Sequence, residues 1–137
     1  MRDVAVIGFA QETAFKDRER NEVEFIIPVV QEAVRQSGMG RHDIGFTISG
    51  SCDYLAGGPF TFVMGLDGVG AWPPVKESHV EMDAAWALYE AWVAIQTGEV
   101  DSALIYGFGK SSTGDLHEDE INSPLRESRR ETIAWFL

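Results

Sequence analysis

The pattern of apolar and polar residues divides the chain into short strands and helices. Residues 3–9 (DVAVIGF) form a run rich in Val and Ile, which a glycine and a polar turn then interrupt. Residues 44–49 (IGFTIS) and 102–108 (SALIYGF) have the same character. Such short runs are typical of strands buried on both faces of a sheet. The pattern therefore predicts three buried strands.

A first helix is predicted from Asn21 onward, where the apolar spacing changes to the helical period. Its apolar face consists of Val23, Ile26, Ile27, Val30, Ala33 and Val34. Asn21 and Glu24 have the spacing of a capping box, and Gly38 supplies a stop signal. Pro28 conflicts with this pattern, because a proline inside a helix removes a hydrogen bond. The helix is either kinked or begins nearer Pro28, so its C-terminal half is the firmer prediction.

A second helix is predicted over residues 83–97, which Gly98 ends. Good helix formers fill this segment, and only Glu90 and Gln96 interrupt a run of Ala, Trp, Leu, Tyr, Val and Ile. A helix that is apolar all round is a buried helix. We therefore expect residues 83–97 to lie inside the molecule.

Residues 56–77 are expected to form a long irregular loop, because glycines and prolines recur throughout them. Several of its other residues are large and apolar, namely Phe60, Phe62, Val63, Met64, Leu66 and Trp72. So much apolar surface in an irregular segment predicts packing against another chain or another part of the protein.

The element order predicts an α/β fold, with a mostly parallel sheet, helices on both faces and right-handed crossovers. In such a sheet, reactive groups gather at the carboxyl ends of strands and the amino ends of helices. His79, Glu81 and Asp83 fall at this position, just before the second helix. The commoner explanation is that Asp83 caps the helix, worth about 1 kcal/mol, and that Glu81 is an acid of its first turn.

The composition and net charge indicate which kinds of partner this chain can bind. The 137 residues are 45% apolar and 24% charged, which suits one compact domain, and the formal charge is −11. This charge repels nucleic acids and anionic membrane surfaces, so neither is expected as a partner. Cys52 is the single cysteine, and the start MRDVAVIGFA lacks the features of a signal peptide. A reducing cytoplasm is the expected location.

Metal and nucleotide sites have little support in the sequence. No His, Cys or carboxylate pair has a zinc-like spacing, so no metal is predicted. The stretch GFGKSST fails as a P-loop, because the required first glycine is replaced by Leu104. His42 and His117 are expected at the surface, and Cys52 is expected to be a partly buried small residue rather than a reactive thiol.

Five phrases of the chain resemble the thiolase superfamily, and in particular its lipid-transfer-protein and sterol-carrier thiolase-like branch, found in bacterial steroid side-chain degradation. They are RDVAVIGFAQ, GSCDYLAGG, GVGAWPP, SHVEMDAAWALYEAWVAIQTGEVDSAL and YGFGKSS. A thiolase has two similar α/β halves, and the resemblance covers the first. It implies a thiolase-like N-terminal half-domain over residues 1–116, followed by a charged tail over residues 117–137 that does not resemble the family.

The resemblance places Glu81 where cysteine-dependent thiolases carry their nucleophile, when Ile95 and Gly98 are matched to the family's Ile-x-x-Gly helix end. A carboxylate at a helix amino terminus is a poor thiolytic nucleophile. Cys52 cannot replace the missing cysteine, because it ends an earlier strand. Relatives without the cysteine include retro-aldolases, which cleave a carbon–carbon bond beta to a CoA thioester. For that chemistry the catalytic candidates are Glu81 and His79.

Three functions follow from the resemblance, in order of preference. The first is a retro-aldol lyase acting on an acyl-CoA thioester, with a steroid side chain as the favoured example. Coenzyme A would then be part of the substrate, no cofactor would be bound, and the 137 residues alone would be inactive. The second is a non-catalytic interaction or lipid-binding module built on a degenerate thiolase half. The third is an acetyl-CoA acyltransferase, which would need a cysteine from elsewhere.

The resemblance also implies partners. Thiolase-like proteins are dimers, and the steroid-degrading relatives bind a small companion subunit with a zinc ribbon and an OB domain. Half of a pseudo-symmetric enzyme would expose the surface that packs on its twin, so self-association or a partner is expected.

Overall fold

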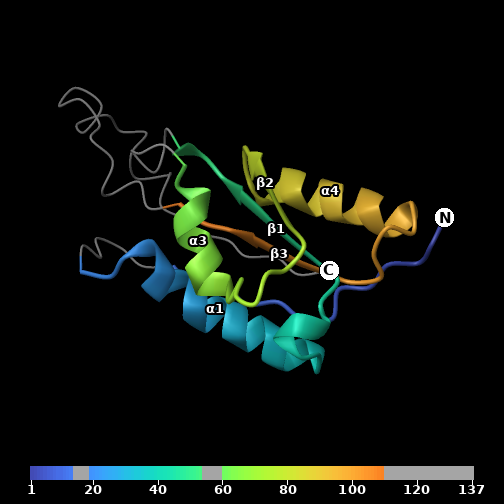
Figure 1. The fold of residues 1–137 in the computed structure, drawn as a ribbon, viewed down its shortest axis with the longest axis horizontal. Helices are drawn as coiled ribbons and strands as arrows, with labels where there is room; N and C mark the ends of the chain where they lie inside the picture. Colours follow the sequence, from blue (N-terminus) through green and yellow to red (C-terminus); the bar gives the residue numbers. More distant parts are fainter. Residues whose placement is uncertain (14–18, 54–59, 110–137) are drawn as a thin grey trace.

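A computed structural model describes residues 1–13, 19–53 and 60–109 of the chain. Figure 1 shows the helices and strands of this part. In chain order they are α1 (Glu22–Ser37), the short 3-10 helix η1 (Arg41–Asp43), β1 (Phe46–Ser51), α3 (Phe62–Val69), β2 (Glu77–Glu81), α4 (Ala84–Gln96) and β3 (Ala103–Gly107).

The three strands form one parallel sheet in the order β2-β1-β3. On one side of β1, Ser49 lies opposite His79, and on the other side it lies opposite Tyr106. Because the strands are parallel, their carboxyl ends meet at one edge of the sheet. The predicted α/β fold with a parallel sheet is confirmed.

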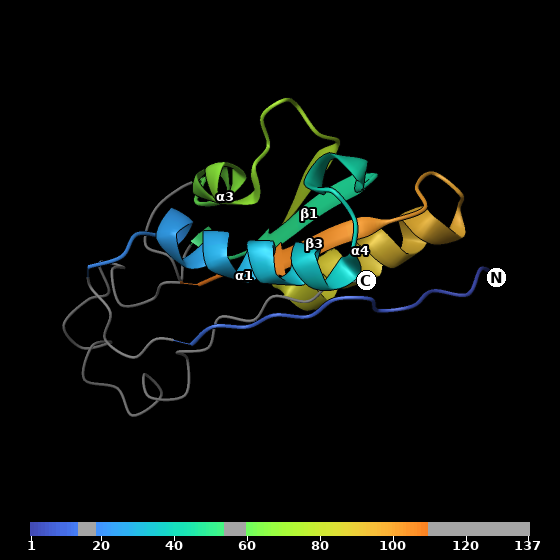
Figure 2. The ribbon, with the colours of Figure 1, turned by 90° about the horizontal axis from the view of Figure 1, so that it is seen from below.

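Helices cover both faces of the sheet, as predicted. Figure 1 shows α4 on one side of the strands and α1 on the other, and Figure 2 shows the same layers from below. The α4 side buries Phe46, Ile48, Ala87, Ala91, Ile95, Val100, Ala103 and Ile105. The α1 and α3 side buries Ala10, Ile26, Val30, Ala33, Val69, Leu104, Tyr106 and Phe108. The sheet therefore separates two apolar clusters.

The capping box that opens α1 is present as predicted. The Asn21 side chain accepts a hydrogen bond from the Glu24 backbone N–H at 3.0 Å, and the Glu24 carboxylate accepts one from the Asn21 backbone N–H at 2.7 Å. Gly38 ends the helix with a φ of 71°. Pro28 lies inside the helix and is exposed, and Glu24, whose carbonyl loses its hydrogen-bond donor, is an exposed residue as well. The N-terminal half of the helix is therefore formed as well.

The strand predicted over residues 3–9 is absent, and strand-type pairing is found only at Ala10, directly after this stretch. The segment instead lies against the helices: the Arg2 guanidinium donates to the Ile95 carbonyl at the end of α4, and Gly8 sits against the Ala33 carbonyl of α1. Figure 2 shows this extended N-terminal segment running past α1. The prediction is wrong because this apolar run is not buried on both faces as a central strand would be: Val6 is 58% exposed and Ile7 is 49% exposed.

The long loop predicted over residues 56–77 is also wrong, since α3 and the start of β2 lie within it. The glycines that suggested a loop are points of close packing. A Cβ on Gly65 would lie 2.9 Å from the Tyr106 hydroxyl, and a Cβ on Gly68 would lie 2.7 Å from the Ile26 side chain. Glycine at these two positions lets α3 approach β3 and α1.

The remaining elements are close to their predicted positions. The strands predicted at 44–49 and 102–108 are found as β1 and β3, and the helix predicted at 83–97 is α4. However, α4 is not buried all round. Its buried face carries Ala84, Ala87, Ala91 and Ile95, whereas Trp86 is 51% and Tyr89 is 56% exposed. Of the helices in the described ranges, none has the length and apolar character needed to cross a membrane.

Candidate functional site

Three polar side chains meet toward the carboxyl edge of the sheet. The Ser49 Oγ atom of β1 lies 3.0 Å from His79 Nδ1 of β2, and His79 Nε2 lies 3.3 Å from a carboxylate oxygen of Glu81. The strand register explains the first contact, because Ser49 and His79 are opposite each other. Period-two alternation explains the second, since residues 79 and 81 share a face of β2. The two sequence candidates, His79 and Glu81, are therefore brought together.

The side chains of His79 and Glu81 differ sharply in how far they are buried. The His79 side chain is only 14% exposed, while that of Glu81 is 52% exposed. The Phe62 ring of α3 stacks on the imidazole, with ring centroids 4.3 Å apart and an interplanar angle of 16°. The imidazole is enclosed, and the carboxylate is the member of the group that solvent or a ligand can reach.

Asp53 is a further site residue, which the sequence did not indicate. Its backbone N–H donates to the second Glu81 oxygen at 2.7 Å. Its own carboxylate accepts hydrogen bonds from the Thr61 hydroxyl at 2.7 Å and from the backbone N–H groups of Thr61 and Phe60. These bonds, led by that of the Thr61 hydroxyl, hold the pKa of Asp53 below its usual value. Asp53 thus links the end of β1 to the start of α3 and fixes the Glu81 carboxylate.

Asp83 is the N-cap of α4, as the capping interpretation predicted. One of its carboxylate oxygens accepts hydrogen bonds from the Ala85 N–H at 2.9 Å and the Trp86 N–H at 3.2 Å. Glu81 does not belong to the first helical turn, because it is the last residue of β2. The capping interpretation is therefore right for Asp83 and wrong for Glu81.

The face of β1 that carries Ser49 is lined by hydroxyl groups. Thr47, Ser49 and Ser51 are each 2% exposed or less. The Arg41 guanidinium donates to the Val69 carbonyl and to Thr47 Oγ1, and burial lowers the pKa of Arg41. Such a polar layer beneath α3 is unusual for the central strand of a small sheet, where apolar residues are the rule. Through Ser49, this layer provides a hydrogen-bonding partner on the buried side of His79.

Tyr106 lies opposite Ser49 on β3, and burial raises its pKa to about 12. The Ser49 hydroxyl acts in the opposite direction, but burial dominates. The phenol is therefore protonated throughout the neutral range and can donate a hydrogen bond there.

We expect the buried phenol to make the chain less stable in alkali. In the unfolded state Tyr106 should ionise near its ordinary pKa of about 10, so the stability present below about pH 10 is lost as the pH rises toward the folded value of about 12. Denaturant unfolding at a series of alkaline pH values measures this loss. The Tyr106→Phe variant should lose less stability over this range than wild type. Tyr89→Phe is the matched control, because Tyr89 is exposed, and it should follow wild type.

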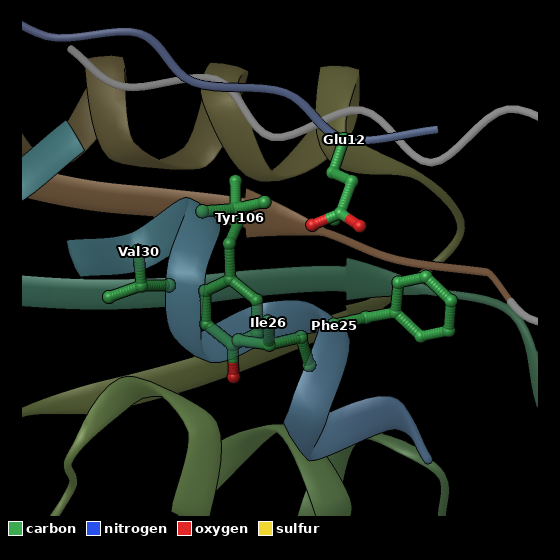
Figure 3. A pocket seen from close by; sticks show the side chains of 7 residues that line it. Glu12, Phe25, Ile26, Val30 and Tyr106 are labelled. Carbon is green, nitrogen blue, oxygen red and sulfur yellow. The ribbon is translucent and has the colours of Figure 1, made fainter. Parts of the chain in front are cut away.

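A small apolar pocket opens beside Tyr106, near the end of β3. It is lined by Glu12, Phe25, Ile26, Val29, Val30, Tyr106 and Gly107. Figure 3 shows the Glu12 carboxylate directed toward the space between Tyr106 and Phe25. Glu12 is paired with Arg20 at 2.6 Å, so its charge is already compensated at the protein surface. The pocket offers apolar contact and no free polar group of known role.

The other candidates contribute little to this site. His42 is exposed in η1, as expected, and Cys52 is a partly buried free cysteine directly after β1. Within residues 1–13, 19–53 and 60–109, no three His, Cys, Asp or Glu side chains are grouped so as to hold a metal ion. His117, the residues of GFGKSST after Gly109, and the predicted tail over 117–137 lie outside the described residues.

Comparisons with known proteins were made on sequence and on structure. No family model matches the sequence, and no curated protein matches it. Solved structures with a similar fold include the following two. One is 3-oxoacyl-[acyl-carrier-protein] synthase III from Aquifex aeolicus, with a TM-score of 0.56 and 17% identity over 69% of this chain. The other is a cysteine-to-serine variant of Xanthomonas campestris OleA with bound lauric acid and lauroyl-CoA, with a TM-score of 0.61 and 18% identity over 88% of this chain.

The match spans 32% of the synthase and 40% of OleA, so this chain corresponds to well under half of either protein. At these identities the comparison establishes the fold and leaves the chemistry open. The chain therefore shares the α/β fold of part of each of these two proteins.

Proposed function

We propose that this chain is part of a thiolase-superfamily protein that acts on acyl thioesters of coenzyme A or acyl carrier protein. Two observations support this class. The fold is shared with a 3-oxoacyl-[acyl-carrier-protein] synthase and with an OleA that holds lauroyl-CoA. A half-exposed carboxylate, Glu81, stands at the carboxyl edge of the parallel sheet, where open α/β sheets bind their ligands.

Within that class we propose carbon–carbon bond cleavage by a retro-aldol reaction, with the CoA ester of a steroid side chain as the favoured substrate. The observation that carries the chemistry is the Glu81 carboxylate, which replaces the thiolase sulfur in the sequence resemblance and has a donor on each oxygen. Each carboxylate oxygen has two lone pairs, so one remains for a substrate proton. The steroid substrate rests on the resemblance.

The proposed step uses Glu81 as a general base. Glu81 takes the proton of the substrate's β-hydroxyl, and the bond between the α and β carbons breaks as a new carbonyl forms. The electron pair passes to the thioester as an enolate, and the carbonyl product leaves. The enolate then takes a proton at the α carbon, which gives the shortened acyl thioester and returns Glu81 to its starting state if Glu81 supplies that proton. His79 and the Asp53 N–H hold the carboxylate in place.

A non-catalytic interaction module is the second candidate, and one observation favours it. The outer side of α4 presents an aromatic row, in which Trp86 meets Tyr89 edge-to-face at 6.2 Å and Tyr89 stacks on Trp92 at 6.3 Å. Exposed aromatic surface of this kind suits a protein contact. Acyl transfer through a thioester on the enzyme has the least support, because Glu81 and not a cysteine stands at the position that the resemblance gives to the nucleophile.

The test is thioester cleavage by the complete protein that contains this chain, measured as release of a carbonyl product from a β-hydroxyacyl-CoA. Activity is expected with the complete protein and not with the 137 residues alone. The assay should be run with and without a zinc-ribbon and OB-domain companion, and sedimentation of the same samples reports the proposed homodimer. Absence of cleavage under every condition, combined with complex formation, would establish the interaction module instead.

A further inference from the structure

Ser49, His79 and Glu81 have the residue types of a serine hydrolase triad, but their burial is the reverse of what that chemistry needs. A nucleophilic serine must reach a substrate carbonyl, and the orienting acid is the buried member. Here Ser49 is 2% exposed, whereas the Glu81 side chain is 52% exposed. The end of this group that can meet a substrate is the carboxylate, so the serine has another role.

When the imidazole is neutral, the hydrogen-bonding capacity of the three groups fixes the direction of their bonds. A carboxylate can only accept, so His79 Nε2, 3.3 Å from Glu81, must carry the proton. In a neutral imidazole the other nitrogen is then an acceptor. The Ser49 hydroxyl, 3.0 Å from Nδ1, must therefore donate to it. The Ser49 oxygen still has lone pairs on its other side, toward Tyr106, its neighbour on β3.

We infer that Ser49 is a positioning residue that acts through His79: its hydroxyl anchors Nδ1, so that the Nε2–H group of the enclosed imidazole is held against Glu81. The ring is clamped in three ways, by Ser49 from β1, by Glu81 from β2 and by the Phe62 ring from α3. The importance of this clamp for catalysis rests on the proposed function. The tautomer inferred for His79 does not depend on the proposed function.

The acidic groups around His79 are Glu77, which shares its face of β2, together with Glu81 and Asp53, and Tyr106 is the nearby phenol. Glu81 lies on its own strand, and the Asp53 carboxylate is close enough that His79 contributes to lowering the pKa of Asp53. Tyr106 lies beyond Ser49 on β3. No described group donates to Nδ1 except Ser49. Removal of that hydroxyl should therefore leave Nδ1 without a partner, and the imidazole should lose one of its three restraints.

Nitrogen-15 NMR of the histidine side chains in the 137-residue chain tests this inference. In mildly alkaline solution, wild-type His79 should be the Nε2–H tautomer with a hydrogen-bonded Nδ1. In Ser49→Ala the Nδ1 resonance should move toward the value of a nitrogen without a hydrogen bond. Exchange of the Nε2 proton with water should become about fivefold faster, the factor that matches one ordinary hydrogen bond. The exposed His42 is an internal reference.

Ser51→Ala is the matched control. Ser51 lies on the same face of the same strand and is also 2% exposed, and within the described residues its Oγ has no hydrogen-bond partner. This substitution should leave both His79 signals unchanged. Ser49→Thr, which keeps a hydroxyl, should restore the wild-type signals and also guards against misfolding of the alanine variant. An Nδ1–H tautomer in wild type, or unchanged His79 signals in Ser49→Ala, would overturn the inference.

Activity separates this inference from the proposed function. In the complete protein, Ser49→Ala should lower kcat for thioester cleavage and leave KM nearly unchanged, because Ser49 does not contact substrate. The NMR result decides whether Ser49 positions His79. If His79 responds as expected and kcat does not change, the inference stands and the role of Glu81 as a base fails.

Discussion

Glu81→Gln should lower the rate of thioester cleavage by the complete protein by about 10²–10⁴-fold, the usual contribution of a positioned general base. Glutamine preserves the size of the side chain, and its amide oxygen can still accept the His79 Nε2–H bond. It cannot take up a proton, so the loss should fall on kcat with little change in KM. Steady-state kinetics of carbonyl release measure both constants.

Glu90→Gln is the control for this substitution, because Glu90 is an exposed carboxylate on α4, away from the polar cluster. It removes the same charge and should leave cleavage unchanged. A Glu81→Gln enzyme as fast as wild type would remove Glu81 from the mechanism.

Gly50→Ala should destabilise the chain by about 3 kcal/mol or more, at the upper end of the cost of overpacking. Gly50 lies on the central strand, and α4 begins directly against it. A Cβ there would lie 2.2 Å from the Asp83 carbonyl oxygen and 2.7 Å from the Ala84 nitrogen. These are backbone atoms, so the start of α4 must move. Such a loss is a large share of the 5–15 kcal/mol of an ordinary domain. Urea unfolding followed by circular dichroism measures it.

Gly45→Ala is the matched control, since Gly45 lies just before the same strand. A Cβ there would meet the Ser102 carbonyl oxygen at 3.4 Å, an ordinary contact, and the residue does not have a positive φ. We expect a change within about 1 kcal/mol, because a methyl group fits there without strain. Equal losses in the two variants would show that α4 does not pack on β1 as closely as described.

The parts of the fold that depend on local chemistry could be predicted from the sequence. The Asn21 and Glu24 capping box and the Asp83 N-cap are formed by residues two or three apart, so their spacing is visible in the chain. The strands β1 and β3 were predicted within about two residues, because they are buried on both faces and so are continuously apolar or small.

The elements that depend on distant contacts were missed. Gly65 and Gly68 indicate a loop by their local preference, yet they lie in α3 because Tyr106 and Ile26 occupy the space that side chains would need. The strand β2 (ESHVE) has little apolar character, and its pairing comes from β1. In contrast, residues 3–9 have the composition of a strand, but Gly8 and Phe9 contact α1. Tertiary context overrides local preference in each case.

The candidate site could be predicted only in part, for the same reason. His79 and Glu81 share a strand, so their proximity follows from alternation along the sequence. Ser49 and Asp53 are 30 and 28 residues away from their partners in the site and join it only through strand register and the turn into α3. No short motif connects them. Their place in the site could be predicted only if the register between β1 and β2 were already known.

Because the sheet separates two apolar clusters, each cluster should contribute to the free energy of unfolding largely independently of the other. The side chains of Ile48 and Ile105 belong to the α4 layer, whereas those of Leu104 and Tyr106 belong to the α1 and α3 layer. Substitutions on opposite sides share few neighbours, so their energetic effects should sum with little coupling. An engineer could therefore redesign the α4 layer for stability while the hydroxyl-lined side that supports His79 stays untouched.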